Sequence, residues 1–112
     1  MKTQFYTYLQ KLQDTITSKL EELDGKATFV EDLWKRPEGG GGRTRVISGG
    51  NVFEKGGVNI SAVEGELPQV LRDNFGVKEG NFFACGLSLV LHPKNPMVPT
   101  VHANWRYFEM YD

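Results

Sequence analysis

Residues 82–109 read FFACGLSLVLHPKNPMVPTVHANWRYFE, and this stretch decides the fold class. Apolar and polar side chains alternate in its two halves, 82–92 and 100–108, which is the period-two pattern of β-strands. Three prolines among residues 92–99 predict a stiff hairpin loop between them. If the two strands pair antiparallel, their apolar sides merge into one core surface.

The opposite sides of these two segments would merge into a polar patch. Its members are Ser88, His92, His102, Asn104 and Arg106. Two imidazoles, a fixed cation, an amide and a hydroxyl suit an anionic ligand with proton transfer nearby. Alternation by itself favours a solvated sheet face. Both histidines of the chain fall on this one face, and this favours a binding site.

Upstream of this stretch the sequence predicts a long helix and several shorter elements. Apolar residues recur three and four apart over residues 2–23, which predicts an amphipathic helix, and Gly25 would end it. Strands are predicted over residues 27–34, 44–47 and 58–63, and a short helix over 67–75. Trp34 and Trp105 are expected in the core.

Four consecutive glycines, Gly39–Gly42, precede Arg43 and Arg45. A nucleotide-binding P-loop is excluded, because no Lys-Ser or Lys-Thr follows the glycines and the next residues predict a strand. Two interpretations stay open. One is a loop whose backbone N–H groups and guanidinium groups bind a carboxylate, and the other is a flexible connector with solvated arginines.

Composition limits the class of protein further. With 112 residues, 13 Lys and Arg and 14 Asp and Glu, the formal charge of −1 suits one small domain and excludes a strongly basic nucleic-acid binder. The single cysteine, Cys85, rules out an internal disulfide and falls on the predicted apolar side. The longest apolar run, 82–91, is too short for a membrane helix, and residues 1–13 lack a signal-peptide pattern. We therefore expect a cytoplasmic protein.

Two segments of the chain resemble the oxygen-dependent coproporphyrinogen III oxidase family. They are residues 82–109, quoted above, and residues 29–68, FVEDLWKRPEGGGGRTRVISGGNVFEKGGVNISAVEGELP. The most specific part is the spacing H-P-x-N-P-x-x-P-T-x-H-x-N-x-R over residues 92–106. The resemblance implies an α+β fold, a large antiparallel β-sheet flanked by helices on both faces, and a homodimer. This chain would hold an N-terminal helix and the first strands of that sheet.

The resemblance also implies an activity in heme biosynthesis. Members of the family oxidatively decarboxylate two propionates of coproporphyrinogen III to vinyl groups, which gives protoporphyrinogen IX. Molecular oxygen is the co-substrate, and no organic cofactor is expected. A divalent metal has been proposed for some members.

Roles for individual residues are carried over from the family position by position. His102 matches the proton donor, and His92 and His102 match metal ligands. Ser88 and the segment Asn104–Arg106, which includes Trp105, match substrate-binding positions. Because Trp105 falls on the predicted core side, we expect it to contact substrate through its backbone.

The substrate's four carboxylates suggest additional ligands. Guanidinium groups hold carboxylates bidentately, so Arg106, with Arg43 or Arg45, is expected to bind propionates. The family's catalytic domain continues past Asp112, so we expect residues 1–112 to be one incomplete N-terminal part of it, inactive alone. Two alternatives are a truncated chain that binds a tetrapyrrole without turnover and a structural fragment of the family.

Overall fold

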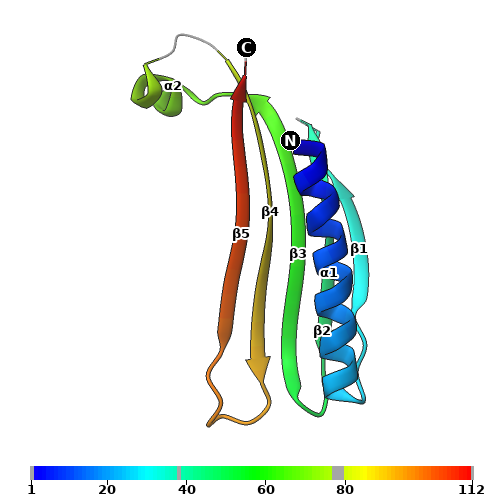
Figure 1. Ribbon diagram of the computed structural model, residues 1–112. Coiled ribbons are helices and arrows are strands. Elements are labelled where there is room, and N and C mark those ends of the chain that lie inside the picture. The colour runs from blue at the N-terminus through cyan, green and yellow to red at the C-terminus, as the bar shows by residue number, and fades with distance from the viewer. Residues whose placement is uncertain (1, 38, 77–79, 112) are drawn as a thin grey trace.

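In a computed structural model the chain forms one antiparallel sheet with a long helix on one face (Figure 1). The structure describes residues 2–37, 39–76 and 80–111. In chain order the elements are α1 (Lys2–Asp24), β1 (Val30–Lys35), β2 (Gly40–Ser48), β3 (Phe53–Glu66), α2 (Gln69–Phe75), β4 (Asn81–Pro93) and β5 (Val101–Tyr111). The predicted α+β class is confirmed.

The sheet is a simple meander of five strands, in the order β1-β2-β3-β4-β5. Residues that face each other across a ladder point to the same side of the sheet, so the register sorts every strand into two faces. Leu87 lies opposite Ile60 on β3 and opposite Trp105 on β5, which places all three on the side of α1. We call the other side the open face, because no helix of the described residues packs on it.

The core lies between α1 and the sheet. Leu9 of α1 is fully buried, and it packs against apolar side chains of the inner strands. Those side chains are Ile47, Phe53, Val58, Ile60, Phe83, Cys85, Leu87, Leu89 and Leu91. Burying one large aliphatic or aromatic side chain contributes about 1.5–3 kcal/mol, so this layer accounts for the attachment of α1. The alternation predicted for residues 82–92 is thereby confirmed.

A single buried carboxylate ties the end of α1 to the turn between β2 and β3. Asp24 accepts hydrogen bonds from five backbone N–H groups at 3.0–3.3 Å, those of Lys26, Ala27, Asn51, Val52 and Phe53. The N–H groups of Phe53 and Ala27 contribute most to holding the pKa of Asp24 far below its usual range. A Cβ on Gly50 would collide with the Asp24 carboxylate, so glycine leaves room for this contact.

From Gly40 onward the glycine run belongs to strand β2, so it forms neither a loop nor a flexible connector, and the carboxylate-binding role of the segment stays a prediction. Gly39 and Gly40 have φ of +122° and +94°, which bends the chain into β2. From Gly40 onward the run pairs with β3, and from Gly41 onward with β1 as well. A Cβ on Gly42 would collide with the Trp34 ring, so the absence of a side chain at Gly42 leaves space for the indole.

Strands β2 and β3 are longer than the sequence predicts, whereas β1 is shorter, covering Val30–Lys35 against a prediction of residues 27–34. Strand β3 covers Phe53–Glu66, against a prediction of residues 58–63, and β2 covers Gly40–Ser48, against 44–47. The predicted strand begins only after Gly56 and Gly57, but the ladders on both sides of β3 continue through these two residues. Pairing on both edges outweighs the weak strand propensity of glycine.

Helix α1 covers only one face of the sheet, and α2 lies beyond the sheet's end (Figure 1). Helices on both faces are therefore not present among the described residues. No helix in the described ranges is both long enough and apolar enough to cross a membrane.

Candidate functional site

The predicted polar patch exists and lies on the open face. Ser88 faces Asn104 across the β4–β5 ladder, Gly86 faces Arg106, and Val90 faces His102. His92 follows two residues after Val90 on the same side of β4. The antiparallel pairing and its register, on which this patch depended, are confirmed.

A small pit lies at one end of the patch. It is lined by Ser61, Gly86, Leu87, Ser88, Asn104 and Arg106. A Cβ on Gly86 would lie 3.2 Å from Cγ of Arg106 and 2.8 Å from the carbonyl oxygen of Trp105. The missing side chain of Gly86 therefore allows the stem of Arg106 to lie across β4.

The same arginine borders an apolar hollow. A cavity of about 140 Å³ next to the pit is lined by Ser61, Val63, Ala84, Cys85, Arg106, Tyr107 and Phe108. The ring of Phe108, which lines this cavity and is 48% exposed, stacks on Phe82 with the centroids 6.1 Å apart. A cation between a polar pit and an apolar hollow suits a ligand with an apolar body and carboxylate arms.

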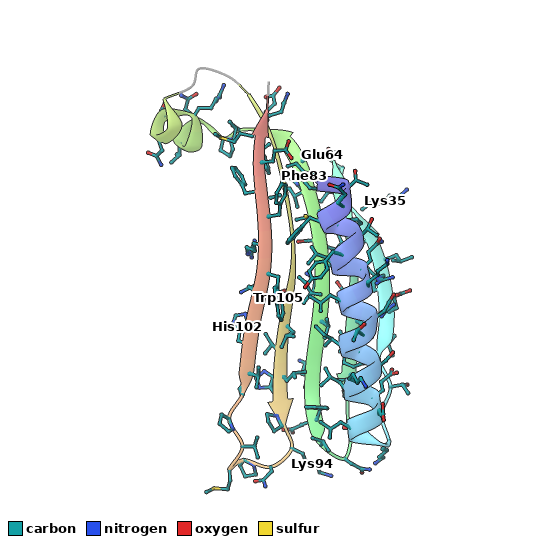
Figure 2. All side chains as sticks on the ribbon, in the orientation of Figure 1. Lys35, Glu64, Phe83, Lys94, His102 and Trp105 are labelled. Carbon is teal, nitrogen blue, oxygen red and sulfur yellow. The ribbon has the colours of Figure 1, made fainter. Side chains whose placement is uncertain are left out.

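The two histidines are exposed at the other end of the patch. His102 lies on β5 (Figure 2), and Nδ1 of His92 lies 3.5 Å from the hydroxyl of Thr100. Within residues 2–37, 39–76 and 80–111, no three His, Cys, Asp or Glu side chains gather closely enough to hold a metal ion. A metal needs three or four protein ligands in a typical catalytic or structural site, so these two imidazoles do not make a complete set. A metal at His92 and His102 stays a prediction.

The open face continues beyond the predicted patch onto β2 and β3. In one row across the sheet, Thr44 faces Asn59, which faces Ser88. Nε1–H of Trp34 donates to Oγ1 of Thr44 at 3.0 Å, and Oγ1 of Thr44 donates to Oδ1 of Asn59. Sequence reasoning missed Thr44 and Asn59, although Asn59 alternates with buried Val58 and could have been placed outward by that pattern.

Neither tryptophan is a core residue as predicted. Trp34 is half-buried on the open face, where it lies over Gly42. Trp105 lies on the α1 side but is 37% exposed, because α1 packs mainly on β3 and β4 and hardly reaches β5 (Figure 2). Its side chain points away from the open face, and its carbonyl oxygen is the atom near Gly86. The expected backbone contact with substrate stays a prediction.

Arg43 and Arg45 lie on the α1 side, away from the patch. Arg43 donates to the side chain of Gln13, and its Nη2 lies 3.1 Å from Oδ1 of Asp14. Arg45 donates through Nε and Nη2 to Oε1 of Glu31, at 3.0 and 2.8 Å. The structure does not bring these arginines to the other predicted ligands, and a substrate-binding role for them stays a prediction.

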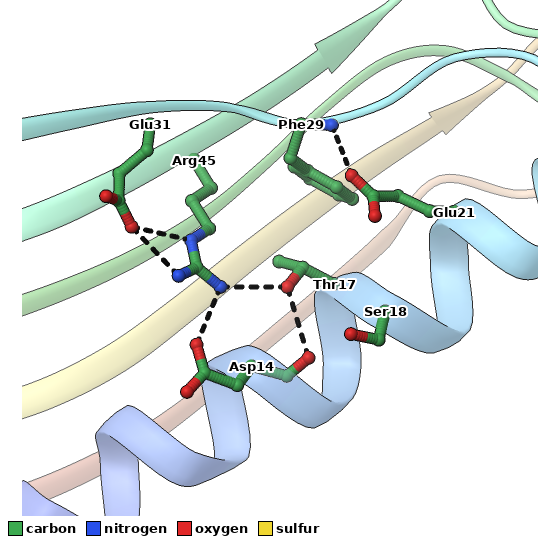
Figure 3. A pocket seen from close by; sticks show the side chains of 7 residues that line it. All are labelled: Asp14, Thr17, Ser18, Glu21, Phe29, Glu31 and Arg45. Atoms are coloured by element: carbon green, nitrogen blue, oxygen red, sulfur yellow. Dashed lines mark hydrogen bonds and ion pairs between the residues drawn. The ribbon is translucent and has the colours of Figure 1, made fainter.

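Figure 3 shows a pocket that Arg45 helps to line. It holds about 410 Å³ between α1 and the first two strands and is lined by Asp14, Thr17, Ser18, Glu21, Phe29, Glu31 and Arg45. Burial alone would lower the pKa of Arg45, but its hydrogen bonds and ion pairs with Glu31 and Asp14 raise it. The guanidinium group is thus held by acidic partners of its own chain.

Cys85 fits the predicted role of a small core residue. It is 3% exposed, and burial raises the pKa of its thiol. A buried, protonated thiol is a poor nucleophile.

Comparisons with known proteins identify relatives of this chain. A sequence profile of the coproporphyrinogen III oxidase family matches residues 4–112. The chain is 56% identical over 103 residues to an oxygen-dependent coproporphyrinogen-III oxidase of Prochlorococcus marinus (strain MIT 9515), which covers 90% of this chain and 30% of that protein. It is 57% identical over 100 residues to the protein of the same name from Parasynechococcus marenigrum (strain WH8102), covering 88% of this chain and 28% of that one. The chain therefore spans less than a third of the length of these curated relatives.

Proposed function

This chain belongs to the coproporphyrinogen III oxidase family, and we propose that it contributes the open-face site of an oxygen-dependent coproporphyrinogen III oxidase. The reaction converts two propionates of coproporphyrinogen III to vinyl groups. Each propionate loses carbon dioxide and two hydrogens, and molecular oxygen takes up the two electrons and two protons as hydrogen peroxide. The porphyrinogen supplies the electrons, so the proposal includes no organic cofactor.

One observation carries the proposal: Arg106 lies over Gly86, beside the facing pair Ser88 and Asn104. A guanidinium group binds a carboxylate with two parallel hydrogen bonds, and a neighbouring hydroxyl and amide fix its orientation. The apolar hollow with Phe108 would take part of the pyrrole framework. The open face thus offers a cationic, polar site for a carboxylate and an apolar hollow for the ring framework, as a tetrapyrrole with carboxylate arms requires.

His102 is the residue that we propose for proton transfer. It lies two positions before Asn104 on the same side of β5, so its imidazole borders the ligands proposed for the propionates. An imidazole donates and accepts protons near neutral pH. Within the proposal, His102 moves a proton while Arg106 and Asn104 keep the reacting propionate in place.

The proposal extends to the environment of the site. The open face has no cover among the described residues, and oxidation of a porphyrinogen needs a closed pocket that excludes side reactions. We therefore expect the 112-residue chain alone to be inactive. A homodimer and a cytoplasmic location belong to the same proposal.

The test is an oxygen-consumption assay on anaerobically prepared coproporphyrinogen III with the full protein that carries these residues. We expect vinyl product together with oxygen uptake, and neither with residues 1–112 alone. Binding of the substrate without oxygen uptake by the full protein would indicate a tetrapyrrole-binding protein instead. No binding at all would indicate a structural member of the family.

A further inference from the structure

We propose that Asn59 is a further ligand for a carboxylate of the substrate, held in orientation by Thr44 and Trp34. This rests on the proposed function, because it assigns an additional ligand to the same open-face site. Asn59 lies on β3, beside Ser88 on β4. Thr44 and Trp34 do not touch the substrate in this proposal and act as positioning residues.

The hydrogen bonds between these side chains have only one possible direction. The indole N–H of Trp34 can only donate, so Oγ1 of Thr44 must accept it. The single hydroxyl hydrogen of Thr44 is then available for Oδ1 of Asn59, which accepts it. With the oxygen of the amide occupied from the β2 side, the two N–H groups of Asn59 are its remaining donors.

The position of Asn59 directs those donors to the proposed site. Asn59, Ser88 and Asn104 follow one another in a row across β3, β4 and β5. Neighbouring strands lie about 4.8 Å apart, so the row spans roughly 10 Å. One ligand with several carboxylates can contact all three side chains.

The hydrogen bonds from Trp34 to Thr44 and from Thr44 to Asn59, which we call the relay, can form only because residue 42 is glycine. A Cβ on Gly42 would collide with Cζ2 of Trp34, so only glycine at this position lets the indole lie over β2 and reach Thr44. Gly42 therefore has a positioning role at the site, although it contributes no side chain.

The central test is Asn59→Asp in the full protein. Aspartate keeps the oxygen that accepts from Thr44, so the relay and the fold remain, but it loses the N–H donors and adds a negative charge. A hydrogen bond to a charged group contributes about 1.5–3 kcal/mol, which corresponds to a loss of affinity of roughly 10- to 150-fold.

The probe is coproporphyrin III, the stable oxidised form of the substrate with the same four carboxylates, and binding is followed by fluorescence. Asn74→Asp, on the exposed surface of α2, is the charge-matched control and should bind within about twofold of the unchanged protein.

A second pair of variants tests the relay. Thr44→Val removes the hydroxyl that orients Asn59 and should weaken coproporphyrin III binding several-fold, whereas Thr44→Ser keeps the hydroxyl and should restore it. A merely structural role would lower the melting temperature in both variants without this difference in affinity. If Asn59→Asp does not fold, the comparison of Thr44→Val with Thr44→Ser decides.

The outcomes separate this inference from the proposed function. Unchanged affinity of a folded Asn59→Asp, in a protein that binds and converts the substrate, overturns the role of Asn59 and leaves the function intact. Failure of the unchanged protein to bind coproporphyrin III overturns both. Weakened binding in Asn59→Asp and Thr44→Val, with normal binding in Asn74→Asp and Thr44→Ser, supports the inference.

Discussion

Gly86 and Arg106 face each other across the β4–β5 ladder, and the bare backbone of the glycine gives the arginine's stem its place on the open face. The cation at the centre of the proposed site therefore depends on a residue that contributes no side chain. A substitution at Gly86 can therefore displace Arg106 without removing any side chain that would contact the substrate.

Gly86→Ala should displace Arg106 and weaken substrate binding. The added Cβ would meet the Trp105 carbonyl at 2.8 Å and Cγ of Arg106 at 3.2 Å, so the neighbours must shift. Overpacking of this kind typically costs about 1–3 kcal/mol of stability. We expect KM for coproporphyrinogen III to rise at least several-fold in the full protein, measured alongside the melting temperature.

Gly57→Ala is the matched control for that substitution. Gly57 also lies on the open face, but a Cβ there has its nearest neighbour at 4.0 Å, which is ordinary contact. Equal KM values for Gly86→Ala and Gly57→Ala would contradict the role assigned to Gly86.

Arg43→Gln should lower the stability of the protein, because it removes the contacts of Arg43 with α1. The Arg43 side chain is 18% exposed, and its guanidinium group is held by Gln13, Asp14 and the carbonyl oxygen of Gln10, all of them on α1. Loss of such partly buried, charge-assisted hydrogen bonds costs about 1–3 kcal/mol in the free energy of unfolding, measurable by urea denaturation. Lys55→Gln, at an exposed position of β3, removes the same charge and should unfold like the unchanged protein. A loss of affinity at normal stability would instead establish Arg43 as a substrate ligand.

Asp24→Asn should destabilise the protein and change how its stability depends on pH. An amide can accept through one oxygen only, so several of the five N–H groups that Asp24 now satisfies would lose their partner. The folded pKa of Asp24 lies below the unfolded one, so its contribution is complete above about pH 3.9 and is lost as the pH falls toward the folded value. Thermal melts should show a lower melting temperature at neutral pH and a weaker decline in acid than in the unchanged protein.

Asp32→Asn is the control for this pH dependence, since Asp32 lies exposed on the edge strand β1. Its melting curve should follow that of the unchanged protein at every pH. If Asp24→Asn also does so, then the carboxylate does not fasten α1 to the β2–β3 turn.

The sequence contained enough to predict the β4–β5 hairpin and its polar patch, because apolar residues recur at every second position of both strands and thereby fix which side chains face the core. It was insufficient for the glycine run, since a residue without a side chain carries no periodicity, and the strand there forms through pairing with β1 and β3. The sequence could have predicted that Arg45 faces α1, because it lies two residues before buried Ile47 on the same side of β2. The contacts of Asp24 could not be predicted from the sequence, since its partners in the β2–β3 turn lie 27 to 29 residues away.

The most direct test of the central claim is the turnover of His102→Ala in the full protein, with coproporphyrin III binding measured on the same sample. General acid–base catalysis contributes about 10²- to 10⁴-fold, so we expect turnover to fall by at least a hundredfold. Affinity should change by less than a few-fold, because Arg106, Asn104 and Ser88 remain in place. Unchanged turnover in His102→Ala would contradict the assignment of the reaction to the open face of β4 and β5.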